Sequence, residues 1–208
     1  RGVVCLALVL PLSVAPGALA AQGDHYAFVD VTILPMTGPE TVAGQTVIVR
    51  DGHIGEVGDA DSVDVPDGVT VIDGAGRYLM PGVAEMHGHY AQDPDSQVAR
   101  DILFLYVANG VTLVRGMQGG PQHLPLRDQI EAGEVLGPRL LVSAPMLAGI
   151  GGNPVATPED GEARVRQAVE LGFDHLKVHE GLSREVYAAI AGTANELGIR
   201  FAGHVTNY

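Results

Sequence analysis

Short apolar runs separated by turn residues dominate residues 26–78 and predict β-strands there, at 28–34, 46–50, 53–57 and 69–72. Asp51-Gly52 joins the second run to the third. A type I′ turn needs positive φ at both central positions, so this dipeptide between β-branched runs predicts a hairpin. These strands are too few to close a domain alone. We expect residues 21–78 to form the N-terminal part of a small β-sandwich whose other strands come from elsewhere.

From residue 79 the pattern changes to an alternation of strands and helices. Apolar runs predict strands at 79–86, 111–114, 139–143, 175–178 and 200–205, and helical segments lie between them at 96–108, 124–132, 158–171 and 184–197. Thr157 and Ser183 stand where N-caps belong, and Gly172 and Gly198 follow the helix ends. Such alternation indicates an α/β fold with a parallel sheet covered by helices.

Polar residues gather where the predicted strands end. His87 and His89 follow the first strand, Lys177 and His179 the fourth, and His204 the fifth. Convergence of strand ends this far apart in the sequence favours a closed barrel over an open sheet. We therefore expect residues 79–208 to supply about the first five strands of a TIM-like (β/α)8 barrel.

A dinucleotide-binding sheet is the competing interpretation, with Gly149, Gly151 and Gly152 as its phosphate loop. These glycines follow the third strand rather than the first and lack the GxGxxG spacing. Asn153-Pro154 also interrupts the run into the next helix. We interpret this stretch as a flexible loop above the site, while a phosphate-binding barrel stays an alternative.

The N-terminal residues 1–20 have the pattern of a signal peptide. An apolar stretch from Val3 to Val14 leads to Ala18-Leu19-Ala20, a small-x-small cleavage pattern, and it contains the single cysteine, Cys5. The stretch is too short and interrupted to span a bilayer well. We expect cleavage after Ala20, export to a periplasm or beyond, and no stable membrane span afterwards.

The amino-acid composition limits the classes of partner that the chain can bind. The 208 residues are 46% hydrophobic and carry 12 basic against 25 acidic side chains, for a net charge of -13. This balance argues against nucleic acid or an anionic membrane as a partner. Eleven of the basic residues are arginine, and the only lysine, Lys177, lies in an apolar run. A buried lysine can lose its proton, whereas an arginine cannot, so Lys177 is a candidate for chemistry.

The histidines and Lys177 together suggest metal chemistry. Residues two apart in a strand point to one face, so His87 and His89 present two imidazoles, and Gly88 between them leaves room. Imidazole is the usual neutral ligand of zinc, and His204 offers a third ring. A neutral Lys177 can react with carbon dioxide to form a carbamate able to bridge two cations, roughly 3.5 to 4 Å apart in two-metal sites.

The segment from Val71 to His89, with its Gly-Ala-Gly-Arg-Tyr-Leu-Met-Pro-Gly centre and His-Gly-His end, resembles the entry into the first barrel strand of the amidohydrolase superfamily. Residues 108–115 and Gly137-Pro138-Arg139 are similar to its imidazolonepropionase-like and Xaa-Pro-dipeptidase-like branch. The resemblance implies a binuclear centre, usually of two zinc ions, and hydrolysis of an amide, cyclic amide or peptide bond by a metal-bound hydroxide.

The resemblance also implies a role for each matching residue. His87 and His89 match the ligands of one metal, Lys177 the carbamylated bridge, and His204 a ligand of the other metal. The family's remaining histidine and its general-base aspartate would fall beyond Tyr208. We therefore expect the 208 residues of this chain to be part of a longer protein, and we expect catalysis to require the other part of that protein.

Three further residues are lower-ranked candidates for binding a small amide or peptide substrate, and each has an equally ordinary alternative. Tyr90 could touch substrate or pack over the barrel mouth, His179 with Glu180 could reach substrate or support a ligand, and Arg115 could bind a carboxylate or make a structural ion pair. A non-catalytic barrel that serves as a binding or assembly module is the alternative function. Assembly into a homo-oligomer is left open.

Overall fold

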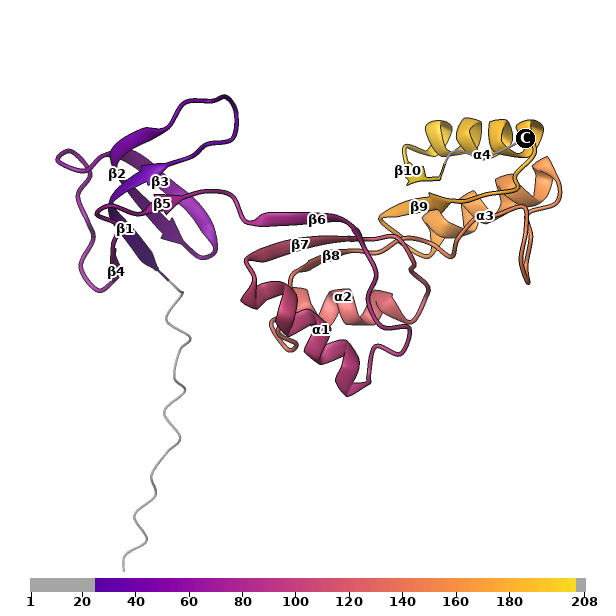
Figure 1. The fold of residues 1–208 in the computed structure, drawn as a ribbon, viewed down its shortest axis with the longest axis horizontal. Helices are drawn as coiled ribbons and strands as arrows, with labels where there is room; N and C mark the ends of the chain where they lie inside the picture. Colours follow the sequence, from indigo (N-terminus) through magenta and orange to yellow (C-terminus); the bar gives the residue numbers. More distant parts are fainter. Residues whose placement is uncertain (1–24, 205–208) are drawn as a thin grey trace, which may run out of the picture. The chain divides into compact units, whose positions relative to one another are not determined.

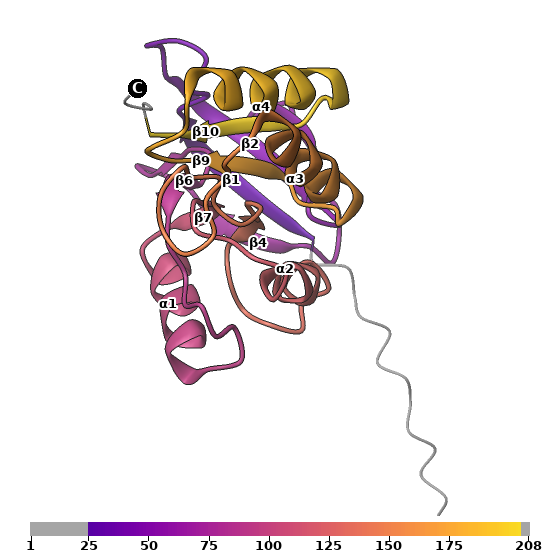
Figure 2. The same cartoon turned by 90° about the vertical axis from the view of Figure 1, so that its right-hand side faces the viewer.

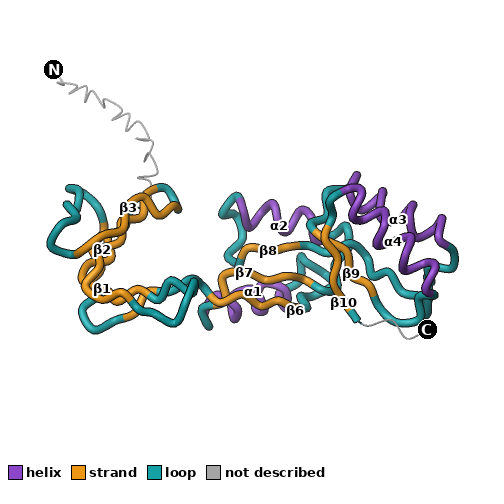
Figure 3. Tube along the Cα trace, turned by 90° about the horizontal axis from the view of Figure 1, so that it is seen from above, coloured by secondary structure: helices purple, strands orange, loops and turns teal. Residues whose placement is uncertain are grey.

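The computed structural model describes residues 25–204, and the predicted signal peptide lies outside them. The chain divides into two compact units that meet between Pro81 and Gly82. Among the described residues the first unit contains strands and loops, whereas helices alternate with strands in the second (Figure 3). Figure 1 colours both along the chain. No helix between residues 25 and 204 has the length and apolar character needed to cross a membrane.

The first unit is one twisted sheet. Its strands are β1 (Tyr26–Ile33), β2 (Val42–Arg50), β3 (His53–Asp59), β4 (Thr70–Asp73) and the two-residue β5 (Tyr78–Leu79). The order is β3-β2-β1-β4, and β5 also pairs with β1. Asp51 and Gly52 have φ of 51° and 75°, and β2 and β3 are antiparallel, so the predicted hairpin is confirmed.

Between residues 82 and 204 the second unit holds five strands, parallel within each sheet, and four helices. The strands are β6 (Val83–Gly88), β7 (Val111–Gly116), β8 (Arg139–Leu141), β9 (His175–Val178) and β10 (Arg200–Gly203), and the helices are α1 (Gln97–Ala108), α2 (His123–Glu131), α3 (Pro158–Glu170) and α4 (Arg184–Leu197). Pairing runs β6-β7-β8 in one sheet and β9-β10 in another. The bridges Ser143↔His175 and Leu147↔Val178 join β9 to the residues after β8. The strands thus neighbour one another in chain order.

Each helix of the second unit packs on a strand beside it in the sequence: α1 on β7, α2 on β8, α3 on β9 and α4 on β10. Figure 2 shows α4 lying along β10. The core between helices and strands contains Leu140, Val165, Leu176 and Ile190, none more than 1% exposed. This parallel, helix-covered arrangement is the α/β organisation that the alternation predicts.

The helix ends are set by local side chains. Ser96, Thr157 and Ser183 each accept a hydrogen bond from the backbone N–H three residues on, as N-caps do. Helix α4 ends at Gly198 in the left-handed conformation, with φ of 71°. Capping therefore fixes the residues at which α3 and α4 begin. It thereby also fixes where the loops after β8 and β9 end.

Candidate metal and catalytic site

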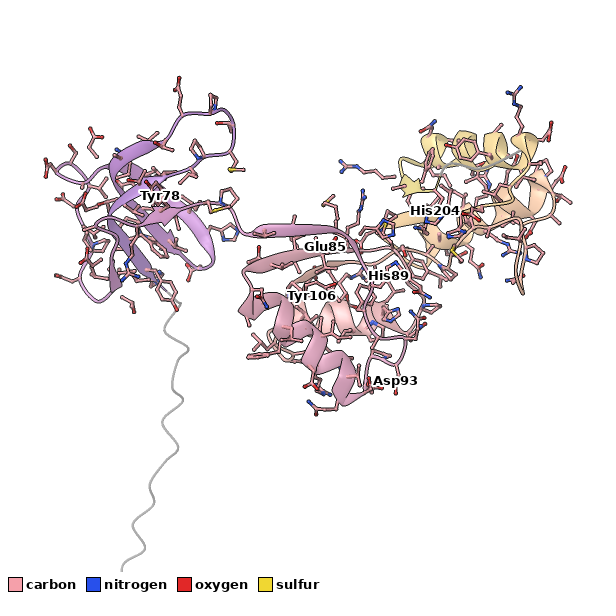
Figure 4. The ribbon with its side chains drawn as sticks, in the orientation of Figure 1. Tyr78, Glu85, His89, Asp93, Tyr106 and His204 are labelled. Carbon is pink, nitrogen blue, oxygen red and sulfur yellow. The ribbon has the colours of Figure 1, made fainter. Side chains whose placement is uncertain are left out.

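Parallel strands carry the predicted site residues to one edge. His87 is in β6 and His89 directly after it, Lys177 is in β9, and His204 follows β10. Since neighbouring parallel strands end on the same edge of a sheet, these side chains come from one edge of the second unit. Figure 4 labels His89 and His204.

Lys177 is the centre of this cluster. The residue is only 1% exposed, and its Nζ lies 3.4 Å from Nε2 of His87. Burial lowers the pKa of Lys177, and the nearby positive charge of Arg115 lowers it further. Both effects favour the neutral amine, the form that acts as a nucleophile.

Two further imidazoles lie near the ring of His87. The ring centre of His87 is 5.5 Å from that of His89 and 6.5 Å from that of His204. His179 stacks on His204 with ring centres 3.9 Å apart. Nδ1 of His204 lies 3.6 Å from a carboxylate oxygen of Glu180. The structure thus brings together all four predicted metal ligands, with His179 and Glu180 beside them.

The charge state of two of these rings, those of His87 and His179, suits metal binding. Burial lowers the pKa of His87, and Lys177, His89, His204 and Arg115 lower it further through their charges. The pKa of His179 is lowered by burial and by His204. A lowered pKa keeps an imidazole neutral near pH 7, which is the state that binds a metal ion.

The donors fit zinc or a similar ion in type, because neutral imidazoles and a potential carbamate are ligands such ions accept. These donors are too few to hold a metal ion by themselves. Among residues 25–204, no three histidine, cysteine, aspartate or glutamate side chains are close enough to hold a metal ion by themselves. A complete coordination shell therefore needs the modified Lys177 or ligands from outside this range.

Gly88 lies tightly against the adjacent strand. A Cβ at this position would lie 2.3 Å from Cγ1 of Val114 on β7. The packing of β6 on β7 therefore leaves no space for a side chain at residue 88. His89 is followed by the buried Tyr90, so the chain turns into the core immediately after the motif.

Two of the lower-ranked candidates have structural contacts instead of an open position. Tyr90 is 5% exposed, belongs to the core and meets the ring of His123 edge-on at 4.7 Å, which matches its packing alternative. Burial raises the pKa of Tyr90 far above its ordinary value. Arg115 donates from Nε to the carbonyl of Met86 at 2.8 Å.

The glycine loop after β8 is tied to the loop after β9. Gly149 donates its N–H to the carbonyl of Glu180 at 2.9 Å, so this donor is already used and does not face a phosphate. Leu147 likewise donates to the carbonyl of Lys177, and His179 donates to that of Leu147. The two loops are thereby joined by strand-like hydrogen bonds at Lys177 and at the residues that follow it.

Two residues of the site were not singled out from the sequence. Glu85 accepts a hydrogen bond from the N–H of His87 at 2.7 Å. His123 is fully buried, and its Nε2 lies 2.9 Å from the carbonyl of Ala91, just after the His-Gly-His motif. The spacing of Glu85, two residues before His87, was the available signal for the first. Nothing in the sequence around His123 marks its contact with residue 91.

Comparison with known proteins gives partial matches. No family model matches the chain. An adenine deaminase from Rubrobacter xylanophilus is 35% identical over 113 residues, which are 49% of this chain and 19% of that protein. A protein assigned as a prolidase from Bifidobacterium longum has a TM-score of 0.76 and 27% identity, covering 88% of this chain and 50% of that one.

A Xaa-Pro dipeptidase with methionine bound in its active site has a TM-score of 0.73 and 18% identity, covering 87% of this chain and 56% of the dipeptidase. At that identity the likeness concerns the fold. The chain spans about half the length of these solved structures and a smaller part of the deaminase.

Proposed function

We propose that this chain is the N-terminal part of a metal-dependent amidohydrolase, since its structural neighbours are amidohydrolase-family proteins and its relatives are hydrolases acting on C–N bonds. On this proposal, β6 to β10 are the first five strands of a (β/α)8 barrel, and the first unit is part of a small β-sandwich. The substrate is a small amide, cyclic amide or dipeptide.

The observation that carries the proposal is the buried amine of Lys177, 3.4 Å from a ring nitrogen of His87 and joined at one sheet edge by His89 and His204. Burying an ammonium without a carboxylate partner costs far more free energy than burying a neutral amine. No salt bridge to Lys177 is formed within the described part of the chain. The site therefore favours an uncharged, reactive Lys177.

Carbamylation would convert Lys177 into an anionic ligand. The lone pair on Nζ attacks the carbon of carbon dioxide, a nitrogen–carbon bond forms, and one proton leaves to solvent. The product keeps the nitrogen and carries two oxygens on the carbon added to it, so it could bridge two cations. His87 and His89 would hold one ion, and His204 would hold the other.

When bound, the two divalent ions, zinc in this proposal, would polarise the substrate carbonyl and bring the pKa of a water molecule toward 7. The chain's own residues supply the setting for that chemistry. Neutral imidazoles at His87 and His179 avoid repelling a cation. His179 and Glu180 lie beside His204 and support its position.

The test is the metal content of the complete protein, purified without chelator and supplied with zinc and bicarbonate. We expect about two zinc ions per wild-type chain, as in two-metal hydrolases, and fewer in Lys177→Ala. Leu176→Met, a near-isosteric change at the buried position next to Lys177, is the matched control and should keep both ions. Labelling with ¹³C-bicarbonate should give a carbamate signal in the wild type and in Leu176→Met, and none in Lys177→Ala.

The outcomes separate the alternatives. The bridging role of Lys177 would be refuted if the wild type held two zinc ions without a carbamate signal and Lys177→Ala held as much zinc as the wild type. Absence of metal from the wild type under these conditions would instead favour the non-catalytic binding module. For the phosphate-binding alternative, phosphate rather than zinc would raise the thermal unfolding midpoint.

A further inference from the structure

Strand β6 departs from regular pairing with β7 at the predicted metal motif. Glu85 pairs with Val114 and Gly88 pairs with Gly116, so Met86 and His87 together face the single residue Arg115. Two residues opposite one define a β-bulge, which bends the strand and re-aims the side chains within it. His87 therefore leaves the sheet in a direction that a regular strand would not give.

A bulge interrupts the ladder and leaves backbone groups in need of other partners. Here two side chains supply them. Nε of Arg115 donates to the carbonyl of Met86 at 2.8 Å, and a carboxylate oxygen of Glu85 accepts the N–H of His87 at 2.7 Å. Both bonds involve an ionised side chain, so they belong to the stronger class of hydrogen bonds.

The surroundings restrict the bulge further. A Cβ at Gly88 would approach Cγ1 of Val114 at 2.3 Å, Cγ of Glu85 at 3.3 Å and the hydroxyl of Tyr106 at 3.4 Å. The side-chain stem of Glu85 and the Tyr106 hydroxyl from α1 are therefore close to the backbone of Gly88. Figure 4 labels Glu85 on β6 and Tyr106 on α1. The bulge is consequently packed on the side of α1 as well as hydrogen-bonded.

We propose that Glu85 and Arg115 are positioning residues that fix the Met86–His87 bulge and so direct the His87 imidazole toward Lys177 and a bound metal ion. The metal part of this inference rests on the proposed function. Arg115 in this role acts on the strand backbone and not on a substrate carboxylate. Glu85 acts through the backbone N–H of His87.

The experiment measures two quantities in the complete protein. The first is the exchange rate of the His87 backbone amide hydrogen in metal-free protein, and the second is zinc affinity by calorimetry. Glu85→Ala should speed exchange at least tenfold, because it removes the acceptor. Zinc affinity should fall by roughly 10- to 100-fold, the range found when groups supporting a metal ligand are removed.

Glu85→Gln retains a side-chain oxygen that can accept the same bond, so it should restore slow exchange and most of the zinc affinity. Arg115→Met removes the other partner while keeping a long side chain, and should also weaken zinc binding. Glu134→Ala and Arg200→Met change exposed residues away from the bulge and serve as controls. Neither control should alter exchange at His87 or zinc affinity.

Unchanged exchange and unchanged zinc affinity in Glu85→Ala and Arg115→Met would overturn the inference. Faster exchange with wild-type zinc affinity would also overturn it, since the bonds would then be structural only. Should Glu85→Ala fail to fold, Arg115→Met and Glu85→Gln decide the question by the same two measurements. A wild-type protein that binds no zinc would refute the proposed function and the metal part of the inference, whereas amide exchange would still report on the bulge.

Discussion

Gly149 is a position where one added methyl group should break the contact between the two loops beside Lys177. A Cβ there would lie 1.7 Å from the carbonyl oxygen of Gly181 and 2.1 Å from its carbonyl carbon. Both are backbone atoms, which cannot rotate away as a side chain can. Gly149→Ala must therefore separate the loops and lose the hydrogen bond from Gly149 to the carbonyl of Glu180.

The expected cost follows from these two effects. Overpacking in a well-packed site costs typically 1 to 3 kcal/mol, and a lost hydrogen bond about 1 kcal/mol. We therefore expect Gly149→Ala to lower the free energy of unfolding by about 2 to 4 kcal/mol. At 2 to 4 °C per kcal/mol for a domain of about this size, the unfolding midpoint should fall by roughly 4 to 16 °C.

Gly152→Ala is the matched control, because it adds the same methyl group to the same loop. A Cβ at Gly152 meets nothing within 4 Å, and the residue does not have the positive φ that disfavours alanine. Urea unfolding of both variants, followed by circular dichroism, gives the free energies directly. Equal stability of the two variants would refute the reasoning, since the close approach to Gly181 would then carry no cost.

Two further predictions concern pH and capping. Burial, followed by the charge of Arg115, lowers the pKa of His175 from its ordinary 6.5, so the unfolded chain binds more protons there than the folded chain below about pH 6.5. The free energy of unfolding should therefore fall as pH drops through that value. In urea unfolding between pH 7.5 and 5, His175→Leu should show a smaller fall than the wild type. Equal dependence of the free energy on pH in the two proteins would contradict this. Ser183 caps α4 by accepting the N–H of Val186, so Ser183→Ala should cost about 1 kcal/mol and Ser183→Asn much less, measured by thermal unfolding. Equal loss in both Ser183 variants would argue against the cap.

Locally encoded features were predictable from the sequence. Strand β9 and helix α4 have the predicted bounds, and the Asp51-Gly52 turn has positive φ at both residues. Each depends on a short pattern, such as an apolar run, a serine cap or a turn dipeptide, whose physical cause lies within a few residues.

Features that depend on distant contacts were not predictable. The two-residue strand β5 exists because Tyr78 and Leu79 pair with β1, more than 40 residues earlier. The bulge at His87 depends on its pairing with β7, which no pattern in residues 83–88 reveals. The burial of Tyr90 against His123 is likewise a tertiary contact.

The candidate site shows the same division. His87, His89, Lys177 and His204 could be selected because the chemistry of their side chains and their positions at strand ends are visible in the sequence. For Glu85 the only signal was its spacing, two residues before His87, and this signal is weak because a carboxylate in a strand ordinarily faces solvent. Its contact with the N–H of His87 exists only once the strand bulges.

The pairing order of the second unit bears on how the protein is made. Within each of its two sheets, a strand pairs with the next one along the chain, as in Val83 with Val111, Leu113 with Arg139 and His175 with Arg200, so these partners lie about 25 to 30 residues apart. Domains begin to fold during synthesis from the N-terminal side. The strands β7, β8 and β10 therefore leave the ribosome with their partners already made, and each sheet can grow one strand at a time behind the growing chain.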